Sequence, residues 1–183
     1  MGRPRDAHHW VGVFGGPLDE GSRYRKAFLE FVEVLGEHGM GVVHGGGPPE
    51  LVGAVAQAAA ESGTQVRGVV PRELLAAVPS RRVGVIQVAC SWWRRNELLY
   101  LMSDSFVAFP GGLSVVTDLI QVAARGESGW PSKPTLLMNV DGYFDPVLEC
   151  LNRARDEELA GTCETYLRAV GDVEELFDVL WSR

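Results

Sequence analysis

Lysine is scarce in this chain: Lys26 and Lys133 are two of its 17 basic residues, and the remaining 15 are arginines. An enzyme that works through a Schiff base needs a lysine whose amine is buried and lowered in pKa. Lys26 lies at the polar start of a predicted helix, and Lys133 precedes Pro134 at the entry of a predicted strand. Neither position offers that setting, so pyridoxal phosphate chemistry is disfavoured and no cofactor is predicted.

Cysteines and long apolar runs are also few. The three cysteines, Cys90, Cys150 and Cys163, are odd in number and lack Cys-x-x-Cys spacing, which disfavours a disulfide scaffold and a zinc site. The apolar runs fall short of the roughly 18 residues that a membrane span needs. The first residues lack the apolar core and cleavage site of a secretory signal. These features predict a cytoplasmic protein that binds no membrane and no metal.

The chain has no excess of positive charge. It carries 17 basic and 24 acidic residues and a net charge of −7, whereas binding to polymeric nucleic acid needs a basic surface. A mononucleotide needs only a local cradle of donors and is not excluded. With 183 residues and 46% hydrophobic composition, the chain is long enough to bury a full core, and one domain over residues 1–183 is predicted.

Short apolar runs alternate with amphipathic segments along the chain. Strands are predicted near residues 10–15, 40–44, 65–70, 83–89, 105–109 and 134–140, with a weaker pattern at 165–170. Helices are predicted at about 21–38, 49–62, 91–103, 113–126, 143–159 and 172–182. The strand runs are continuously apolar, which is typical of strands covered by helices on both faces. The alternation predicts an α/β fold with a doubly wound, mainly parallel sheet flanked by helices.

Three predicted strands end in glycine-rich turns: "FGGP" (14–17), "HGGGPPELVG" (44–53) and "FPGGLS" (109–114). In such sheets, ligands bind outside the carboxyl ends of the strands, where the strand order reverses. Any one of these turns is equally well explained by the conformational needs of the backbone. Three turns at one edge of one sheet favour a ligand that carries a phosphate.

The turn after residues 105–109 leads directly into a helix. Gly111 and Gly112 allow a close approach to the backbone, and the N–H groups at a helix start favour an anion. Ser114 either caps the helix or donates to a phosphate oxygen. Asp118 lies about one turn further along. It is either a surface carboxylate that complements the helix dipole or a carboxylate of the site.

The sequence "CSWWRR", residues 90–95, is predicted to bring Trp92, Trp93, Arg94 and Arg95 to the same edge. An arginine in this place can hold a phosphate or a carboxylate with two parallel hydrogen bonds. The alternative is that one arginine pairs with a surface acid while the tryptophans pack at an oligomer interface. That alternative applies more to Arg94 than to Arg95.

Several motifs of other enzyme classes are absent from the sequence. The spacing of Gly12, Gly15 and Gly16 does not match Gly-x-Gly-x-x-Gly, which disfavours an NAD enzyme, and the Walker pattern is absent. His44 is interpreted as a residue that packs the turn rather than as a catalyst. No Ser-His-Asp nucleophile set is recognised.

Several segments together carry a family resemblance. "VVHGGGPPELVGAVAQAA", "VRGVVP", "RRNELLYLMSDSFVAFPGG" and "KPTLLMNVDGYFDPVL" resemble the LOG (Lonely Guy) family, often labelled lysine decarboxylase. The resemblance runs in order from about residue 11 to 180. It implies a Rossmann-like fold and a homodimer. It also implies hydrolysis of the N-glycosidic bond of nucleoside 5′-monophosphates, which gives a free base and ribose 5-phosphate.

The family signature is Pro-Gly-Gly-x-Gly-Thr-x-x-Glu, with an Arg-Lys pair upstream. In this chain Pro110 and the two glycines agree, whereas Ser114, Val115 and Asp118 stand where the family has glycine, threonine and glutamate. The Arg-Lys pair becomes Arg95 followed by asparagine. The tyrosine that precedes the triple glycine in the family is a histidine here.

The resemblance implies two catalytic residues: Asp118, which stabilises the cationic ribose and orients the water, and Arg95, which positions the phosphate or the carboxylate. The residues predicted to contact the phosphate or the rest of the nucleotide are Gly16, Gly45, Gly46, Gly47, Trp93, Arg94, Gly111, Gly112 and Ser114. The altered contacts point to an unusual base or a pyrimidine nucleotide. The alternative is a non-catalytic carrier of a nucleotide or cofactor, like the molybdenum-cofactor carriers of the same fold. The missing Gly-Thr pair and lysine favour the carrier, and the surviving acid and arginine favour the enzyme.

Overall fold

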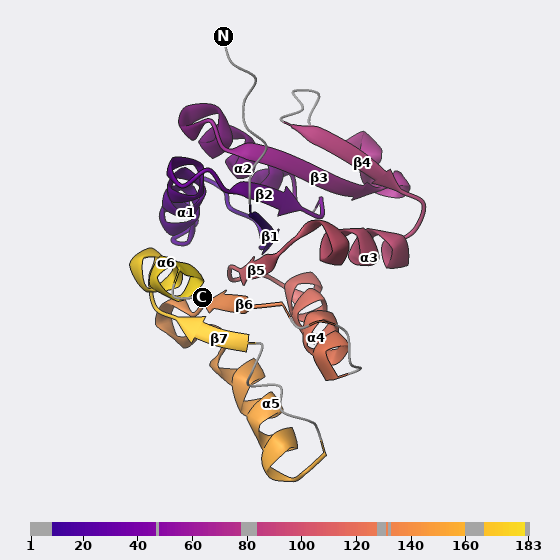
Figure 1. Cartoon of the computed structure of the whole chain (residues 1–183), viewed down its shortest axis with the longest axis vertical. Helices are drawn as coiled ribbons and strands as arrows, with labels where there is room; N and C mark the ends of the chain where they lie inside the picture. The colour runs from indigo at the N-terminus through magenta and orange to yellow at the C-terminus, as the bar shows by residue number, and fades with distance from the viewer. Residues whose placement is uncertain are drawn as a thin grey trace. The chain divides into compact units, whose positions relative to one another are not determined.

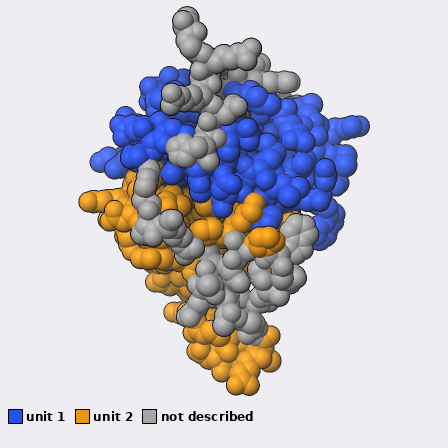
Figure 2. Space-filling model, in the orientation of Figure 1, with its two compact units in different colours: residues 1–13, 17–104 blue, residues 14–16, 105–183 orange. Residues whose placement is uncertain are grey.

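The computed structural model describes residues 9–46, 48–77, 84–127, 131, 133–159 and 167–181. The chain has two compact units, shown in different colours in Figure 2. Unit 1 consists of residues 1–13 and 17–104, and unit 2 consists of residues 14–16 and 105–183. Each unit has its own strands and helices. The single domain over residues 1–183 stays a prediction.

Unit 1 is built on parallel strands in the order β4-β3-β2-β1 (Figure 1). Val11 lies opposite Val42, Val42 opposite Val66, and Gly68 opposite Ile86. Its strands are β1 (Trp10–Phe14, whose last residue belongs to unit 2), β2 (Gly41–His44), β3 (Gln65–Pro71) and β4 (Val85–Ala89). Its helices are α1 (Arg25–Glu37), α2 (Pro49–Ser62) and α3 (Trp92–Met102), with the short 3-10 helix η1 (Arg72–Ala77).

The helices of unit 1 follow from local sequence signals. Phe28, Phe31 and Leu35 recur at helical spacing in α1 and are fully buried. Helix α2 begins with Pro49, whose fixed φ suits a first helical residue, and ends at Gly63 in the left-handed conformation (φ 75°). Helix α1 packs against α2 and β2, whereas α3 packs against β2, β3 and β4. These contacts hold α3 on the strands of this unit.

Unit 2 has the parallel strands β5, β6 and β7, in that order. They are β5 (Ser105–Ala108), β6 (Thr135–Met138) and β7 (Leu167–Val170). Its helices are α4 (Leu113–Glu127), α5 (Asp145–Asp156) and α6 (Val173–Trp181), with the 3-10 turn η2 (Val140–Gly142) after β6. Phe14 stacks on Phe106 with ring centroids 5.2 Å apart, and Phe109 and Phe144 are fully buried. These aromatic rings belong to the core of unit 2.

The described residues thus form seven strands and six α-helices, and all strand pairings given within each unit are parallel. This confirms the predicted α/β class, the Rossmann-like, doubly wound parallel type. Among the helices described, none combines the length and the apolar composition that crossing a membrane requires.

Two predicted helices are shorter than expected. Residues 21–24 do not belong to α1, because a turn precedes it in which the Ser22 N–H donates to the Asp19 carbonyl (3.1 Å) and the Arg25 N–H to the Ser22 carbonyl (3.1 Å). The predicted helix 143–159 begins at Asp145 and ends at Asp156. The other described element ends differ by a few residues, within the usual uncertainty of assigning termini.

Candidate functional site

In unit 1, the candidate site lies at the turn formed by His44, Gly45 and Gly46, called here the β2 turn. The His44 side chain is buried, and its Nδ1 accepts the N–H of Gly46 at 3.3 Å. Gly46 has a φ of 76°, a left-handed conformation that L side chains rarely adopt. The glycine at position 46 is therefore required by the backbone itself. Gly47, the third predicted glycine of this turn, lies outside the described residues.

The imidazole of His44 is neutral near pH 7. Burial and, to a lesser extent, the positive charge of Arg95 lower its pKa from 6.5 to about 4. A neutral imidazole has one nitrogen that accepts a hydrogen bond, which is what the Gly46 N–H requires. His44 therefore acts as a packing and acceptor group of the β2 turn, in agreement with the interpretation from the sequence.

Arg95 joins helix α3 to the β2 turn. Its side chain is buried, its Nε donates to the carbonyl of Gly45 at 3.0 Å, and a terminal nitrogen donates to the Asn96 side chain at 2.7 Å. A Cβ built on Gly45 would collide with the Arg95 guanidinium. The glycine at position 45 thus makes room for this arginine. The structure brings these two predicted site residues together.

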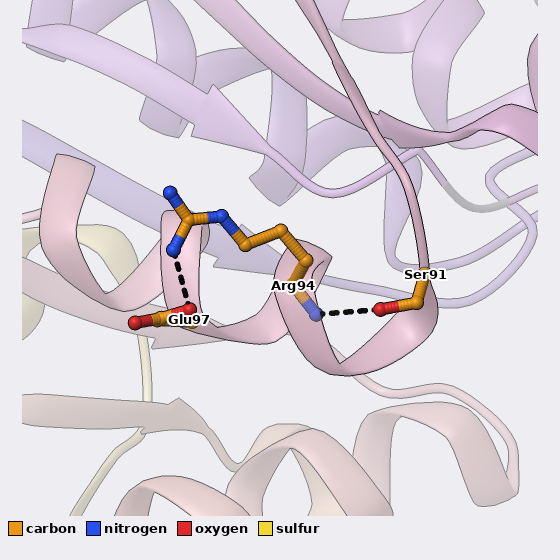
Figure 3. A network of polar contacts seen from close by, with 3 residues as sticks. All are labelled: Ser91, Arg94 and Glu97. Carbon is orange, nitrogen blue, oxygen red and sulfur yellow. Dashed lines mark hydrogen bonds and ion pairs between the residues drawn. The ribbon is translucent and has the colours of Figure 1, made fainter.

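Arg94 and Trp93 lie on the surface of α3. Figure 3 shows the Arg94 side chain paired with Glu97, with nitrogen and oxygen 2.6 Å apart. The Arg94 N–H donates to the hydroxyl of Ser91, which caps the start of α3. This is the surface ion pair considered for Arg94 from the sequence. Trp93 is 80% exposed and its neighbour Trp92 52% exposed.

In unit 2, the candidate site lies at the turn formed by Pro110, Gly111 and Gly112, called here the β5 turn. Gly16 approaches this turn closely, and its N–H donates to the Pro110 carbonyl at 3.1 Å. A Cβ on Gly16 would lie 2.7 Å from the Gly111 Cα, and a Cβ on Gly111 would lie 2.5 Å from the Gly16 nitrogen. Both glycines are therefore needed for two backbone segments to pack together.

Gly112 differs from the other described glycines of the two turns. A Cβ built on it meets no heavy atom within 4 Å, and the residue is exposed. Its carbonyl accepts the N–H groups of Val115 (3.0 Å) and Val116 (3.3 Å), so Gly112 caps the start of α4. The first N–H groups of a helix have no partner within the helix and carry partial positive charge. The protein itself imposes no steric requirement for glycine at position 112.

Ser114 and Asp118 both lie on α4. Ser114 is the second helical residue and is exposed, so it is not the cap that one of the two interpretations proposed. Asp118 is half-buried and lies beyond the first turn, which contains no acidic residue. The helix dipole acts mainly within that first turn. Complementing the dipole is therefore not a sufficient explanation for Asp118.

Tyr143 is a residue of this region that sequence reasoning missed. It follows η2, the turn after β6, and its hydroxyl donates to the carbonyl of Gly111 at 2.5 Å. The sequence places it within a predicted helix that begins at residue 143, whereas the structure has it in the turn that precedes α5. The Asp-Gly pair at residues 141 and 142 is a turn signal that could have found it.

Unit 1 therefore presents a glycine turn held by a buried arginine. Unit 2 presents a glycine turn at a helix start, with a carboxylate further along the helix. Backbone N–H groups and arginine suit a phosphate, and a carboxylate suits a developing positive charge. Among the described residues, no group of three or more His, Cys, Asp or Glu side chains is arranged to hold a metal ion.

The chain is similar to proteins of known name. The family model described as "possible lysine decarboxylase" matches residues 52–180. The cytokinin riboside 5′-monophosphate phosphoribohydrolase LOG of Oryza sativa subsp. japonica is 33% identical over 135 residues, 73% of this chain and 56% of that protein. A probable enzyme of the same name and organism, LOGL9, is 36% identical over 146 residues, 79% of this chain and 64% of that protein. The chain thus spans between about half and two thirds of these two relatives.

Solved structures share the fold. The molybdenum cofactor carrier protein of Chlamydomonas reinhardtii superimposes with a TM-score of 0.68 at 21% identity, covering 95% of this chain and 96% of that one. At this identity the likeness concerns the fold alone. The family model covers well over half of the chain, and the curated relatives exceed 30% identity over more than two thirds of it. The chain therefore belongs to the possible lysine decarboxylase family, which includes the LOG phosphoribohydrolases.

Proposed function

We propose that this protein is a nucleoside 5′-monophosphate phosphoribohydrolase. The proposal rests chiefly on one observation: relatives that match nearly three quarters or more of the chain are named for this reaction. The arrangement of the β5 turn supports it. An exposed glycine at a helix start suits a phosphate, and Asp118 lies further along the same helix.

In the proposed reaction, the bond between C1′ of the ribose and the base nitrogen breaks, and its electron pair leaves with the base. Water adds its hydroxyl to C1′ and supplies the proton that the base gains. The ribose becomes cation-like as the base departs, so the carboxylate of Asp118 would stabilise it and orient the water. The products are a free base and ribose 5-phosphate.

Arg95 would act on the phosphate side of the reaction. Its guanidinium is fixed by the Gly45 carbonyl and the Asn96 side chain, so its position is determined before a ligand binds. Preorganised positive charge of this kind favours a phosphate without a cost for ordering the side chain. The predicted phosphate contacts, Gly16, Gly45 to Gly47, Gly111, Gly112 and Ser114, stay part of the proposal, as do Trp93 and Arg94.

The base is proposed to be unusual or a pyrimidine, because the signature has Ser114, Val115 and Asp118 in place of glycine, threonine and glutamate. The test is incubation with a panel of purine and pyrimidine monophosphates, followed by chromatography for free base and ribose 5-phosphate. Asp118→Asn keeps the size of the side chain but removes its charge. Turnover should fall by roughly 10²-fold or more, while nucleotide binding changes little.

A matched variant sharpens this test. Asp118→Glu restores the longer carboxylate of the family signature and should retain or raise the cleavage of ordinary purine monophosphates. A 5′-monophosphate should also raise the melting temperature more than its free nucleoside does, because it binds the native state more tightly. If neither the wild type nor the glutamate variant released base from any nucleotide, the hydrolase proposal would be wrong.

The second candidate is a non-catalytic carrier of a nucleotide or cofactor. The fold likeness to the molybdenum cofactor carrier protein supports it, as does the missing Gly-Thr pair of the signature. A carrier would show ligand-dependent stabilisation without release of base. The panel experiment therefore distinguishes the two candidates.

We also propose that the protein forms a homodimer through α3 and is located in the cytoplasm. Trp92, Trp93 and Leu101 on this helix are 52%, 80% and 58% exposed, which is the aromatic and apolar composition that interfaces favour. A two-fold symmetric dimer is expected. Light scattering at micromolar concentration should give twice the chain mass, and Trp93→Glu should shift it to one chain. A wild-type monomer would remove the dimer proposal.

A further inference from the structure

Two turns of unit 2 are joined by one hydrogen bond. The hydroxyl of Tyr143, after β6, donates to the carbonyl of Gly111, after β5, at an oxygen–oxygen distance of 2.5 Å. Strands β5 and β6 are hydrogen-bonded neighbours, so their carboxyl ends bring these turns together. Tyr143 is exposed (39%), and its hydroxyl reaches one of the two glycines of the β5 turn.

Tyr143 is held in place by its own turn. Phe144, the next residue, is fully buried, and the Tyr143 ring packs edge-on against its ring with centroids 5.1 Å apart. The Asn139 side chain accepts the N–H of Phe144 at 2.7 Å and donates to the Asp145 carboxylate at 2.7 Å. The Tyr143 ring is thus an exposed side chain held by its contact with the buried Phe144 and by its bond to Gly111.

The geometry of the peptide bond gives this contact a consequence. In a planar trans peptide, the carbonyl of one residue and the N–H of the next point in opposite directions. A peptide between two glycines has more freedom of orientation than one between residues with a Cβ. By accepting a hydrogen bond from Tyr143, the Gly111 carbonyl selects one orientation. The same bond therefore sets the direction of the Gly112 N–H.

We propose that Tyr143 is a positioning residue for the phosphate: its hydroxyl fixes the Gly111–Gly112 peptide so that the Gly112 N–H, next to the first N–H groups of α4, faces the anion. This inference rests on the proposed function. Among the described glycines of the two turns, Gly112 is the one at which a Cβ would meet no other atom of the protein. A glycine in such open space is expected where a ligand approaches the backbone. Tyr143 would act through the peptide and not by touching the reacting atoms.

The test compares Tyr143→Phe with Thr64→Val. The first removes the hydroxyl that bonds Gly111 and keeps the ring that packs on Phe144. The second removes a comparable hydroxyl-to-carbonyl bond, from Thr64 to Val32 at 2.9 Å. Thr64 precedes β3 at its amino end, whereas the two glycine turns follow strands at their carboxyl ends. Thr64→Val also removes the bond between the Thr64 and Ser62 hydroxyls (2.7 Å), so the control loses at least as many hydrogen bonds as Tyr143→Phe, but away from the proposed site.

The readout is the Kd of ribose 5-phosphate by calorimetry, with inorganic phosphate as a second probe. Tyr143→Phe should weaken both by about 5-fold, the effect of one lost hydrogen bond, while Thr64→Val should bind as the wild type does. In turnover assays with a nucleotide that the wild type cleaves, Tyr143→Phe should raise KM about as much and leave kcat within 2-fold. A purely structural role would give the two variants the same Kd.

The possible failures are distinguishable. If the wild type binds ribose 5-phosphate and releases base, but Tyr143→Phe binds within 2-fold of the wild type, the role of Tyr143 is overturned and the proposed function stands. If the wild type neither binds ribose 5-phosphate nor releases base, both fail together.

A spectroscopic measurement on the wild type avoids dependence on any variant. In glycine-labelled protein, the Gly112 amide resonance should shift on addition of ribose 5-phosphate, whereas that of Gly53, the fifth residue of α2, should not. A Gly112 resonance that stays in place while the sugar phosphate binds would overturn the inference.

Discussion

The β2 turn and the β5 turn have nearly the same composition but use their glycines differently. In the β2 turn, Gly45 makes room for the guanidinium of Arg95, and Gly46 takes a left-handed conformation. In the β5 turn, Gly111 packs against Gly16, whereas Gly112 has open space where a side chain would be. A glycine in a turn therefore indicates a ligand only when neither the backbone conformation nor the packing of neighbouring residues requires a glycine at that position.

The two turns also differ in the groups that they would offer to the proposed anion. The β2 turn is completed by a side chain from a distant helix, with a charge that is already fixed. In the β5 turn, the proposed donors are backbone N–H groups at a helix start, and Tyr143 bonds to the carbonyl of Gly111. Substitutions in the first should damage stability and binding together, whereas substitutions at Gly112 should affect binding almost alone.

The largest effect is expected from Arg95→Ala. It removes the donor to the Gly45 carbonyl, leaves space in a buried region and takes away the charge proposed to hold the phosphate. We expect a loss of about 3 kcal/mol in the free energy of unfolding and a fall of roughly 10²-fold in kcat/KM. Denaturant titration measures the free energy of unfolding, and steady-state kinetics measure kcat/KM.

Arg94→Ala is the matched stability control for that experiment. It breaks a surface ion pair with Glu97 and should change the free energy of unfolding by less than about 1 kcal/mol. Equal losses of stability from the two arginines would contradict the assignment of Arg95 as the residue that completes the β2 turn.

The next largest effect is expected from Gly111→Ala. The new Cβ would lie 2.5 Å from both the Gly16 nitrogen and the Val115 side chain, and a backbone atom cannot move aside without shifting its strand end. Overpacking of this kind costs about 3 kcal/mol. Thermal or denaturant unfolding measures the loss. An alanine variant as stable as the wild type would show that the two segments are less closely packed than described.

The third prediction concerns the loss of stability at acidic pH. The pKa of His44 is about 4 in the folded protein and 6.5 in the unfolded chain, because burial, and then Arg95, disfavour its protonation. Between these values the unfolded chain binds more protons, so stability rises with pH. The contribution of His44 to the free energy of unfolding is complete above pH 6.5 and is lost as the pH falls to 4. The difference is up to about 3 kcal/mol.

His44→Asn tests this assignment, because asparagine offers an acceptor for the Gly46 N–H but does not titrate in this range. Free energies of unfolding are measured for both proteins from pH 4 to pH 7. The wild type should lose more stability than the variant on acidification. Parallel curves would mean that His44 is not the group responsible.

The smallest stability effect, and the sharpest contrast, is expected from Gly112→Ala. The Cβ meets nothing within 4 Å, so the free energy of unfolding should change by less than about 1 kcal/mol, while the Kd of ribose 5-phosphate should rise about 10-fold because a ligand would meet the new methyl group. Gly53→Ala is the control. It also places a Cβ in open space, inside α2, and should stabilise the protein by about 0.5–1 kcal/mol without affecting binding. Unchanged binding by Gly112→Ala would remove the β5 turn from the proposed site.

The class of fold could be predicted from the sequence because it depends on local patterns. Apolar runs such as Val42–Val43 and the helical spacing of Phe28, Phe31 and Leu35 report burial directly, and both are buried as predicted. Arg95 could be named as well, although its partner could not. The reasons for individual glycines could not be predicted, because they depend on residues far away in the sequence. Gly45 and Arg95 are 50 positions apart, and Gly111 and Tyr143 are 32 apart.

The bond between Arg95 and Gly45 also has a consequence for the order of folding. Contacts between distant residues form only after the intervening chain has closed a loop, which is entropically unfavourable and slow. Strand β2 ends immediately before this 50-residue interval and β3 lies within it, so the two strands can pair before α3 is in place. The β2 turn therefore reaches its final shape after the strands that support it. In a chain whose α3 has not yet been synthesised, the strands of unit 1 could pair, but the β2 turn would still lack the Arg95 side chain that completes it.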